Sequence, residues 1–268
     1  MTKALAILLT LLAGAARAAT IAALISPTAF VIRDGEALSV ATVPGRPILY
    51  CGLAAYAGWG APLVGRTVTT GPAGVLQLTD GGRQAPLADV LAAAGWLRPP
   101  RLSEAAQAAI VERKGGWACA PRVAPFAVFS QQVDPQILAG IALNESSYRG
   151  RPWPWTLNVA GRGYYFASRE EAYAVVRQLL ASKRCDFDVG IMQVNWCYHA
   201  RRFATPWDAL APAANIRAAE AILLENRQRS GSSVKAVAWY HSADPARGGA
   251  YFARFLEHLK GLDAASTL

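Results

Sequence analysis

Two short motifs in the second half of the chain contain residue types that could carry out acid–base chemistry. Residues 142–148 read ALNESSY and include the carboxylate of Glu145. Residues 188–195 read DVGIMQVN, which is a glycine turn followed by amide side chains. A carboxylic acid can protonate a leaving group, and amides can hold the hydroxyl groups of a sugar. The two motifs are therefore candidates for one site, in which a carboxylic acid lies near amides that could hold a sugar.

The sequence predicts a helix that delivers this carboxylate. Asp134 and Pro135 are typical of an N-cap and the first residue of a helix. Ile137, Ile141 and Glu145 follow at intervals of four, so the carboxylate shares the face that carries aliphatic side chains. Burial raises the pKa of an unpaired carboxylate, and a general acid needs that property near neutral pH. The alternative is a helix-end carboxylate that only reaches solvent.

Four motifs, taken in order, resemble the soluble lytic transglycosylase domain, a lysozyme-like family. The family carries a Glu-Ser pair, a Gly-(Leu/Ile)-Met-Gln-(Ile/Val)-Asn segment, an Asn-Ile helix start and a late motif of alanine and tyrosine. The matching residues are Glu145 with Ser146, residues 190–195, Asn215 with Ile216, and Tyr240 within residues 236–241. The resemblance covers roughly residues 125–262 and implies a mainly α-helical, lysozyme-like domain.

The resemblance implies a peptidoglycan lytic transglycosylase that uses one carboxylate and no cofactor. Glu145 would protonate the glycosidic oxygen between N-acetylmuramic acid and N-acetylglucosamine, and would then accept the proton of the muramoyl C6 hydroxyl. The product would be a 1,6-anhydro sugar. The residues expected to bind the glycan strand are Ser146, Met192, Gln193, Asn195 and Tyr240. Their alternative role is ordinary core and turn packing.

A hydrolytic lysozyme or chitinase on the same scaffold is the alternative enzyme, and its product would carry a reducing end. Glycoside hydrolases ordinarily use two carboxylates. Asp186 and Asp188 precede the glycine turn and could supply the second one, but acidic residues before a turn more often form loops. The sequence therefore favours the single-carboxylate reaction.

One departure from the family is a longer segment between the first two motifs. Residues 151–158 include Trp153 and Trp155, and a capping box at 168–171 starts a further helix that runs to Leu180. The tryptophans either stack on sugar rings or pack the insertion onto the domain. The insertion resembles that of relatives attached to secretion or conjugation machines, so an envelope-spanning complex of that kind is a candidate partner. The residue that replaces the family's serine ahead of the glycine turn stays open.

The first residues are typical of a cleaved secretory signal, which would place the mature protein in the periplasm. Lys3 precedes an apolar run at 4–13, and Ala16 and Ala18 are the small residues that a signal peptidase reads. No later apolar run is long enough to span a bilayer, so we expect no stable membrane insertion after cleavage of residues 1–18. An uncleaved membrane anchor is the alternative.

The four cysteines fit an exported chain with two disulfides, each inside one domain. Cys185 and Cys197 flank the glycine-turn motif, while Cys51 and Cys119 both lie in the N-terminal half. Neither the cysteines nor the three histidines have the spacing of metal ligands, so no metal is expected. The net charge of +9 suits approach to the anionic cell wall. The chain has no arginine-rich run, so nucleic acid is not an expected partner.

The composition predicts a multidomain α+β protein with a signal peptide at 1–18, a module at 19–120, a linker at 121–133 and the transglycosylase domain at 134–262. The N-terminal module resembles the staphylococcal-nuclease-like fold, a small β-barrel of the OB type with flanking helices. The arginine and acidic residues of that family's centre would fall on Leu49, Ala54 and Ala57, which cannot bind calcium. We therefore expect a degenerate, non-catalytic module, with a periplasmic nuclease as the alternative.

Overall fold

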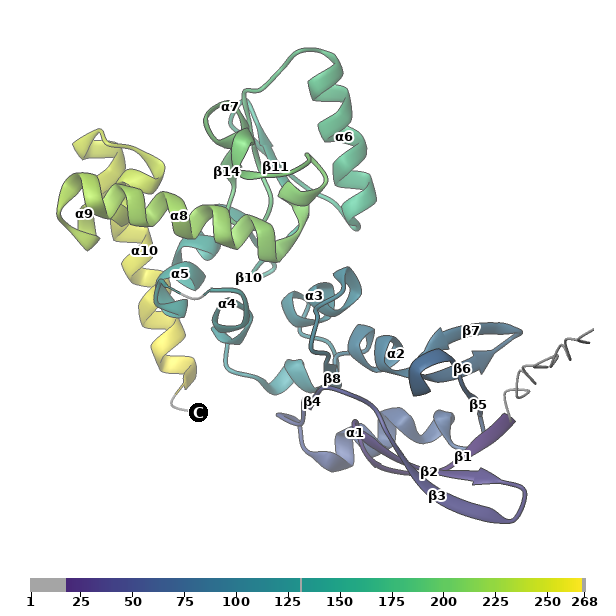
Figure 1. Ribbon diagram of the computed structural model, residues 1–268. Coiled ribbons are helices and arrows are strands. Elements are labelled where there is room, and N and C mark those ends of the chain that lie inside the picture. The colour runs from purple at the N-terminus through teal and green to yellow at the C-terminus, as the bar shows by residue number, and fades with distance from the viewer. Residues whose placement is uncertain (1–17, 131, 267–268) are drawn as a thin grey trace, which may run out of the picture.

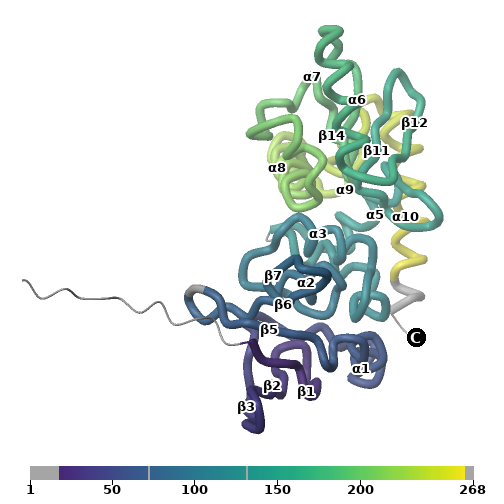
Figure 2. The backbone as a smooth tube through the Cα atoms, turned by 90° about the vertical axis from the view of Figure 1, so that its right-hand side faces the viewer, coloured from purple at the N-terminus to yellow at the C-terminus, as the bar shows by residue number. Residues whose placement is uncertain are grey.

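The computed structural model describes residues 18–130 and 132–266, with a sheet in the N-terminal part and helices in the C-terminal part (Figure 1). In the side view, the strand-rich part lies at one end of the molecule and the helical part at the other (Figure 2). This mixed α/β architecture agrees with the predicted order of a strand-rich module before a helical one. The predicted signal peptide lies outside the described residues, apart from Ala18. Within the described ranges, no helix is both long and apolar enough to cross a membrane.

The N-terminal strands form an open six-stranded antiparallel sheet, in the order β3-β2-β1-β5-β6-β7, and the predicted barrel is not closed. The strands are β1 (Ala18–Ser26), β2 (Ala29–Asp34), β3 (Ala37–Thr42), β5 (Thr67–Thr70), β6 (Leu76–Asp80) and β7 (Arg83–Pro86). A closed barrel would need β3 to pair with β7, and no such pair occurs among the described residues. The side chains of β3 face solvent instead, with Leu38 57% and Val40 63% exposed, so this strand remains an edge.

Helices pack against this sheet and enclose the first hydrophobic core. The other elements of this part are β4 (Arg46–Pro47), α1 (Leu53–Gly60), η1 (Ala61–Leu63), η2 (Pro72–Gly74), α2 (Leu87–Ala93) and β8 (Leu97–Arg98). Phe30 from the sheet, Tyr56 from α1 and Leu91 from α2 are buried together in this core. Ala54 and Ala57, which the nuclease resemblance sets in place of acidic residues, lie on helix α1.

The second hydrophobic core begins ahead of the predicted linker. The elements at this junction are α3 (Glu104–Val111), η3 (Gly115–Cys119) and α4 (Ala124–Phe129). Ile110, Trp117, Phe126 and Phe129 are each at most 5% exposed and belong to the same core as the helical half. Residues 121–133, for which the sequence predicts a linker, therefore include a packed helix.

The helical half surrounds a small four-stranded sheet whose order is β12-β11-β13-β14. Its elements are α5 (Pro135–Ser146), β9 (Ser147–Tyr148), β10 (Arg151–Pro152), β11 (Thr156–Val159), β12 (Arg162–Tyr165), α6 (Arg169–Ala181), β13 (Phe187–Val189), β14 (Val194–Asn195), α7 (Trp196–His199), η4 (Ala200–Arg202), η5 (Asp208–Leu210), α8 (Pro212–Ser230), α9 (Ser233–His241) and α10 (Pro245–Ser266). Helix α5 packs against α10, and α8 packs against α9. The predicted capping box is confirmed, since Ser168 accepts a hydrogen bond from the Glu171 amide at 3.2 Å and α6 follows.

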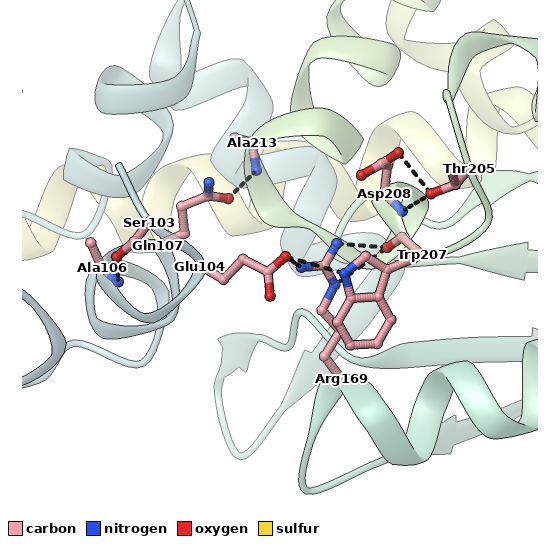
Figure 3. Close-up of polar contacts among 9 residues, drawn as sticks. All are labelled: Ser103, Glu104, Ala106, Gln107, Arg169, Thr205, Trp207, Asp208 and Ala213. Carbon is pink, nitrogen blue, oxygen red and sulfur yellow. Dashed lines mark hydrogen bonds and ion pairs between the residues drawn. The ribbon is translucent and has the colours of Figure 1, made fainter. Parts of the chain in front are cut away.

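Polar contacts tie α3 to the helical half (Figure 3). Arg169, which is 6% exposed, forms an ion pair with Glu104 at 2.5 Å and donates to the Trp207 carbonyl at 2.7 Å. The Trp207 indole N–H donates to the same Glu104 carboxylate at 3.1 Å. Because the buried guanidinium is satisfied on both sides, α3 is held against the start of α6.

Both predicted disulfides are present. Cys51 is joined to Cys119, which links the loop before α1 to the end of η3. Cys185 is joined to Cys197, which brackets the β13–β14 hairpin. Disulfides are typical of proteins that fold in an oxidising compartment, so the pairing agrees with export from the cytosol.

Candidate active site

Helix α5 carries Glu145 in its last turn, as the sequence predicts. The helix begins with the predicted cap, since the Asp134 carboxylate accepts from the Gln136 amide at 2.8 Å and Pro135 follows. Ile141, one turn before Glu145, is fully buried, and Glu145 itself is half-buried. The carboxylate therefore stands at the edge of the core, on the face that the spacing predicts.

Glu145 holds its proton more tightly than an ordinary glutamate, because its pKa is raised to about 8. Burial is the largest cause, and the nearby carboxylate of Asp188 adds to it. The hydroxyl of Tyr251 and the guanidinium of Arg254 act in the opposite direction. At neutral pH the side chain is thus mainly a neutral acid, which is the form that can protonate a leaving group.

Tyr251 of α10 is a deeply buried neighbour of Glu145. Its side chain is 1% exposed, and burial raises its own pKa well above the usual value, so the hydroxyl keeps its proton. Among the groups that lower the pKa of Glu145, this hydroxyl has the largest effect. It nevertheless makes no hydrogen bond of normal geometry within the described chain. The side-chain oxygen of Asn144 is likewise buried and unbonded there, while the Asn144 amide donates to the Tyr251 carbonyl at 3.0 Å.

Ser146 lies beneath the site, where it cannot reach a substrate directly. Its side chain is fully buried, and its hydroxyl donates to the Ile191 carbonyl at 2.6 Å. The amide of Trp153 approaches the same hydroxyl oxygen at 3.3 Å. Ser146 therefore connects the end of α5 to the glycine turn and to the insertion, and it positions Glu145 relative to both.

The glycine turn is clamped by Asn215 of α8. Gly190 has a φ of +81°, and a Cβ there would lie 2.5 Å from the Asn215 side chain. The Asn215 amide donates to the carbonyls of Val189 and Ala209 at 2.9 and 2.8 Å, and its oxygen accepts from the Met192 amide at 2.7 Å. Only glycine fits here, because the position needs both a left-handed backbone and space for this clamp.

The amide side chains of the second motif also stabilise the hairpin. Gln193 donates to the carbonyls of Gly190 and Thr156 at 2.7 and 3.0 Å. Asn195 donates to the Asp188 carboxylate at 2.7 Å and accepts from the Tyr198 amide at 3.3 Å, which caps α7. Gln193 is 7% exposed, so its side chain serves the turn.

Tyr240 of α9 lies beside the same hairpin. Its hydroxyl donates to the Met192 carbonyl at 2.8 Å, and Met192 is fully buried. Burial raises the pKa of Tyr240 well above its usual value, and the carboxylates of Glu145 and Asp188 raise it further. Tyr240, Glu145 and Asp188 therefore interact within one site, although they come from α9, α5 and β13.

The two aspartates before the glycine turn have different environments. Asp186 is exposed and forms an ion pair with Arg184 at 2.7 Å, which is the loop role that the sequence favours for both. Asp188 lies on strand β13 and is half-buried. Burial raises its pKa, while the Asn195 hydrogen bond and nearby His241 lower it. The site thus holds a second carboxylate that the sequence analysis set aside. Asp188 lies between buried Phe187 and Val189, and this alternation was the available sequence signal that it belongs to a strand and not to a loop.

The two tryptophans of the insertion, Trp153 and Trp155, pack against the domain. Trp153 donates its indole N–H to the Phe166 carbonyl at 2.7 Å and meets Trp155 edge-on, with ring centroids 6.0 Å apart. This arrangement agrees with the packing role for both tryptophans. Within residues 18–130 and 132–266, no group of three or more His, Cys, Asp and Glu side chains is arranged to hold a metal ion.

The arrangement can supply a protonated carboxyl group, a second carboxylate and two tyrosine hydroxyls around one position. The sequence analysis considered Asp188 and set it aside as a loop residue. It missed Tyr251 and Arg254, which lie on α10, outside every motif. Comparisons of the chain with protein-family models, with curated proteins and with solved structures found no match.

Proposed function

We propose that this chain is a peptidoglycan lytic transglycosylase. The observation that carries the proposal is the state of Glu145, a carboxyl group with a pKa of about 8 at the end of α5, beside the hairpin that bears the MQVN motif. Few structural roles require a half-buried carboxylic acid to stay protonated at neutral pH. A general acid for glycosidic-bond cleavage does require it.

In the proposed reaction, neutral Glu145 protonates the oxygen that joins C1 of N-acetylmuramic acid to N-acetylglucosamine. The C1–O bond breaks, and the positive charge that develops at C1 is stabilised by the substrate's own acetamido group. The resulting Glu145 carboxylate then accepts the proton of the muramoyl C6 hydroxyl as that oxygen bonds to C1. The glutamate ends protonated, and the product is a 1,6-anhydro sugar. One carboxyl group thus serves first as acid and then as base.

The surroundings of Glu145 support this use of a single residue. Arg254 and the Tyr251 hydroxyl favour its charged form, which offsets part of the effect of burial. Both influences stabilise the carboxylate after the first proton transfer. Asp188 disfavours the charged form of Glu145.

The hydrolytic alternative is supported by one observation, the proximity of Asp188 to Glu145. A second carboxylate could activate a water molecule, or attack C1, as in lysozyme-like hydrolases. Burial raises the pKa of Asp188, while its interactions with Asn195 and His241 act in the opposite direction, toward the ionised form that either role needs. The alternative therefore differs from the proposal in the use of water.

Product analysis separates the two reactions. Purified sacculi are digested with the protein, and the released muropeptides are identified by mass spectrometry. The proposal expects 1,6-anhydro ends, which lack one water molecule and cannot be reduced with borohydride. Products with reducing ends alone would establish hydrolysis. If no muropeptides are released from sacculi, both proposed reactions are ruled out.

We further propose a periplasmic enzyme that opens the wall locally for a secretion, pilus, flagellar or conjugation apparatus. The two disulfides support folding in an oxidising compartment. The N-terminal sheet would act as a non-catalytic module. A nuclease role has little support, because Ala54 and Ala57 on α1 offer no metal ligands.

A further inference from the structure

A cavity of about 320 Å³ lies where the N-terminal part meets the helical half. Its walls come from the end of α3, from α4 and α5, from the β9–β10 turn and from α10. Leu143 of α5 lines it and lies two residues before Glu145, so the two side chains point to nearly opposite sides of the helix. The cavity is therefore separate from the position around Glu145.

Four arginines line this cavity, and none of the described lining residues carries a carboxylate. The arginines are Arg113, Arg122, Arg149 and Arg151. Burial lowers the pKa of Arg113, and the like charges of Arg122 and Arg151 lower it further. Because a guanidinium stays charged in proteins, the cavity holds a concentration of positive charge that an anion would relieve.

Two of these guanidinium groups are held in place by backbone carbonyls. Arg113 donates to Ala118 at 2.8 Å and to Ala120 at 2.5 Å, and Arg151 donates to Glu112 at 3.2 Å. These contacts fix the positive charges before any ligand arrives, which lowers the entropy that binding would cost.

Two of the arginines lie at turns with a left-handed backbone. Arg113 and Arg149 have φ values of +58° and +53°, a region that residues other than glycine rarely adopt. Local turns account for both values: Arg113 caps the end of α3, where the next amide, of Lys114, donates to the Ala109 carbonyl at 2.9 Å, and Arg149 with Gly150 forms the two-residue turn between β9 and β10. These two turns place Arg113 and Arg149 in the lining of the cavity.

We propose that this cavity binds a short peptide with more than one carboxylate. The arginines suit carboxylates, which they can bind with paired hydrogen bonds. The remaining walls are apolar, with Val111, Phe126, Leu143 and Ile191 among them, so they suit the short aliphatic parts of such a peptide. A bare inorganic anion would leave these walls uncovered.

The identification of the peptide rests on the proposed function. The stem peptide of peptidoglycan carries several carboxylates on short side chains, and it is attached to the glycan that the enzyme would cleave. A site on the far side of α5 from Glu145 would hold a stem peptide of the wall while the glycan occupies the active site.

The test measures binding to the whole protein by isothermal titration calorimetry and thermal shift. The probe is the free tripeptide L-Ala-γ-D-Glu-meso-diaminopimelate, and the comparisons are a trialanine amide, an unrelated tripeptide of equal charge and inorganic phosphate. We expect the stem tripeptide to bind and to raise the melting temperature, with affinity that falls as salt rises. We expect hydrogen exchange to slow at residues 111–126 and 149–152.

Substitution then locates the site. The double variant Arg122→Gln and Arg149→Gln is expected to weaken tripeptide binding about tenfold, because each substitution removes one charged partner of a carboxylate. Both side chains are exposed, so the variant should fold. The matched control is Arg177→Gln, an exposed arginine of α6 that does not line the cavity, and it should leave the affinity unchanged. Circular dichroism and melting temperature establish that each variant folds, and exchange protection by the tripeptide in the unmodified protein tests the site independently.

Several results would overturn the inference. Equal binding of phosphate and tripeptide would make the ligand a simple anion, and equal binding of the charge-matched tripeptide would remove the stem peptide as the specific ligand. Unchanged affinity in the double variant, or hydrogen-exchange protection in other segments, would show that the tripeptide does not bind in this cavity. If sacculi are cleaved to anhydro products while the tripeptide does not bind, this inference fails and the proposed function stands. If the tripeptide binds and sacculi are not cleaved, the proposed function fails.

Discussion

Glu145 owes its proposed role to its surroundings rather than to its chemical type. Burial at the end of α5 and the neighbouring Asp188 keep its pKa at about 8. Glu145→Gln preserves the shape but cannot transfer a proton, so the rate of muropeptide release should fall by roughly 10² to 10⁴ fold. Glu170→Gln, a change at an exposed position of α6, is the control and should leave the rate unchanged. Turnover by the Glu145 variant at the wild-type rate would end the assignment.

The same pKa predicts a pH dependence of stability. The folded protein keeps the Glu145 proton up to about pH 8, whereas the unfolded chain loses it near the usual glutamate pKa of 4.5. The free energy of unfolding therefore decreases as pH rises between these values. Glu145→Gln has no charge to bury, so its gain in melting temperature over the wild type should be about 5 °C larger at pH 9 than at pH 4.5. Equal gains at both pH values, measured by circular dichroism, would contradict a raised pKa.

Asp188 is the residue that separates the two candidate reactions. Asp188→Asn keeps the shape beside Asn195 but removes the charge that raises the pKa of Glu145. For a lytic transglycosylase, we expect anhydro products to persist and the decline of kcat at alkaline pH to begin at a lower pH. For a hydrolase, the same variant would lose activity by roughly 10² fold or more at every pH. The pH profile and the product spectrum together decide the outcome.

At the scale of elements, the β13–β14 hairpin is the part that brings the second motif to α5. Gly190→Ala should lower the free energy of unfolding by roughly 3 kcal/mol, because alanine there is strained and would collide with Asn215. Gly231→Ala is the matched control, since Gly231 also has a positive φ, +65°, but has nothing within 4 Å of an added Cβ. It should cost about 1 kcal/mol from backbone strain alone. Chemical denaturation that gives equal losses would show that Asn215 does not clamp the turn.

At the scale of the whole molecule, the packing of α3 with the helical half predicts where the chain can be cut. A fragment of residues 101–268 keeps Ile110, Trp117 and the Glu104–Arg169 ion pair, while a fragment of residues 125–268 lacks them. Only the longer fragment contains Cys119, and it lacks the disulfide partner Cys51, so this fragment carries Cys119→Ser. We expect the longer fragment to melt at least about 10 °C higher and to retain cleavage of sacculi.

Equal melting temperatures for the two fragments would show that α3 and η3 add nothing to the second core. A longer fragment that is folded yet inactive, beside an active whole chain, would place part of the active site in the N-terminal sheet. Both outcomes are read from circular dichroism and from the same muropeptide assay.

The sequence by itself determined the features that depend on near neighbours. Asp134 and Pro135 start α5, the capping box starts α6, and the aliphatic spacing sets the face of Glu145. These signals work because capping and helical periodicity act over a few residues. The cysteine pairing also followed, since each pair was assigned within one half of the chain.

Only the tertiary structure decided what surrounds Glu145 and how the two parts meet. Tyr251 reaches the site from a helix whose contact with Asn144 spans 107 positions, and Asp188 arrives on a strand from another motif. The open sheet and the packed helix at 124–129 likewise depend on edge exposure and on burial against distant residues. Desolvation and charge proximity are set by whichever segments pack together, and local sequence patterns carry little information about that packing.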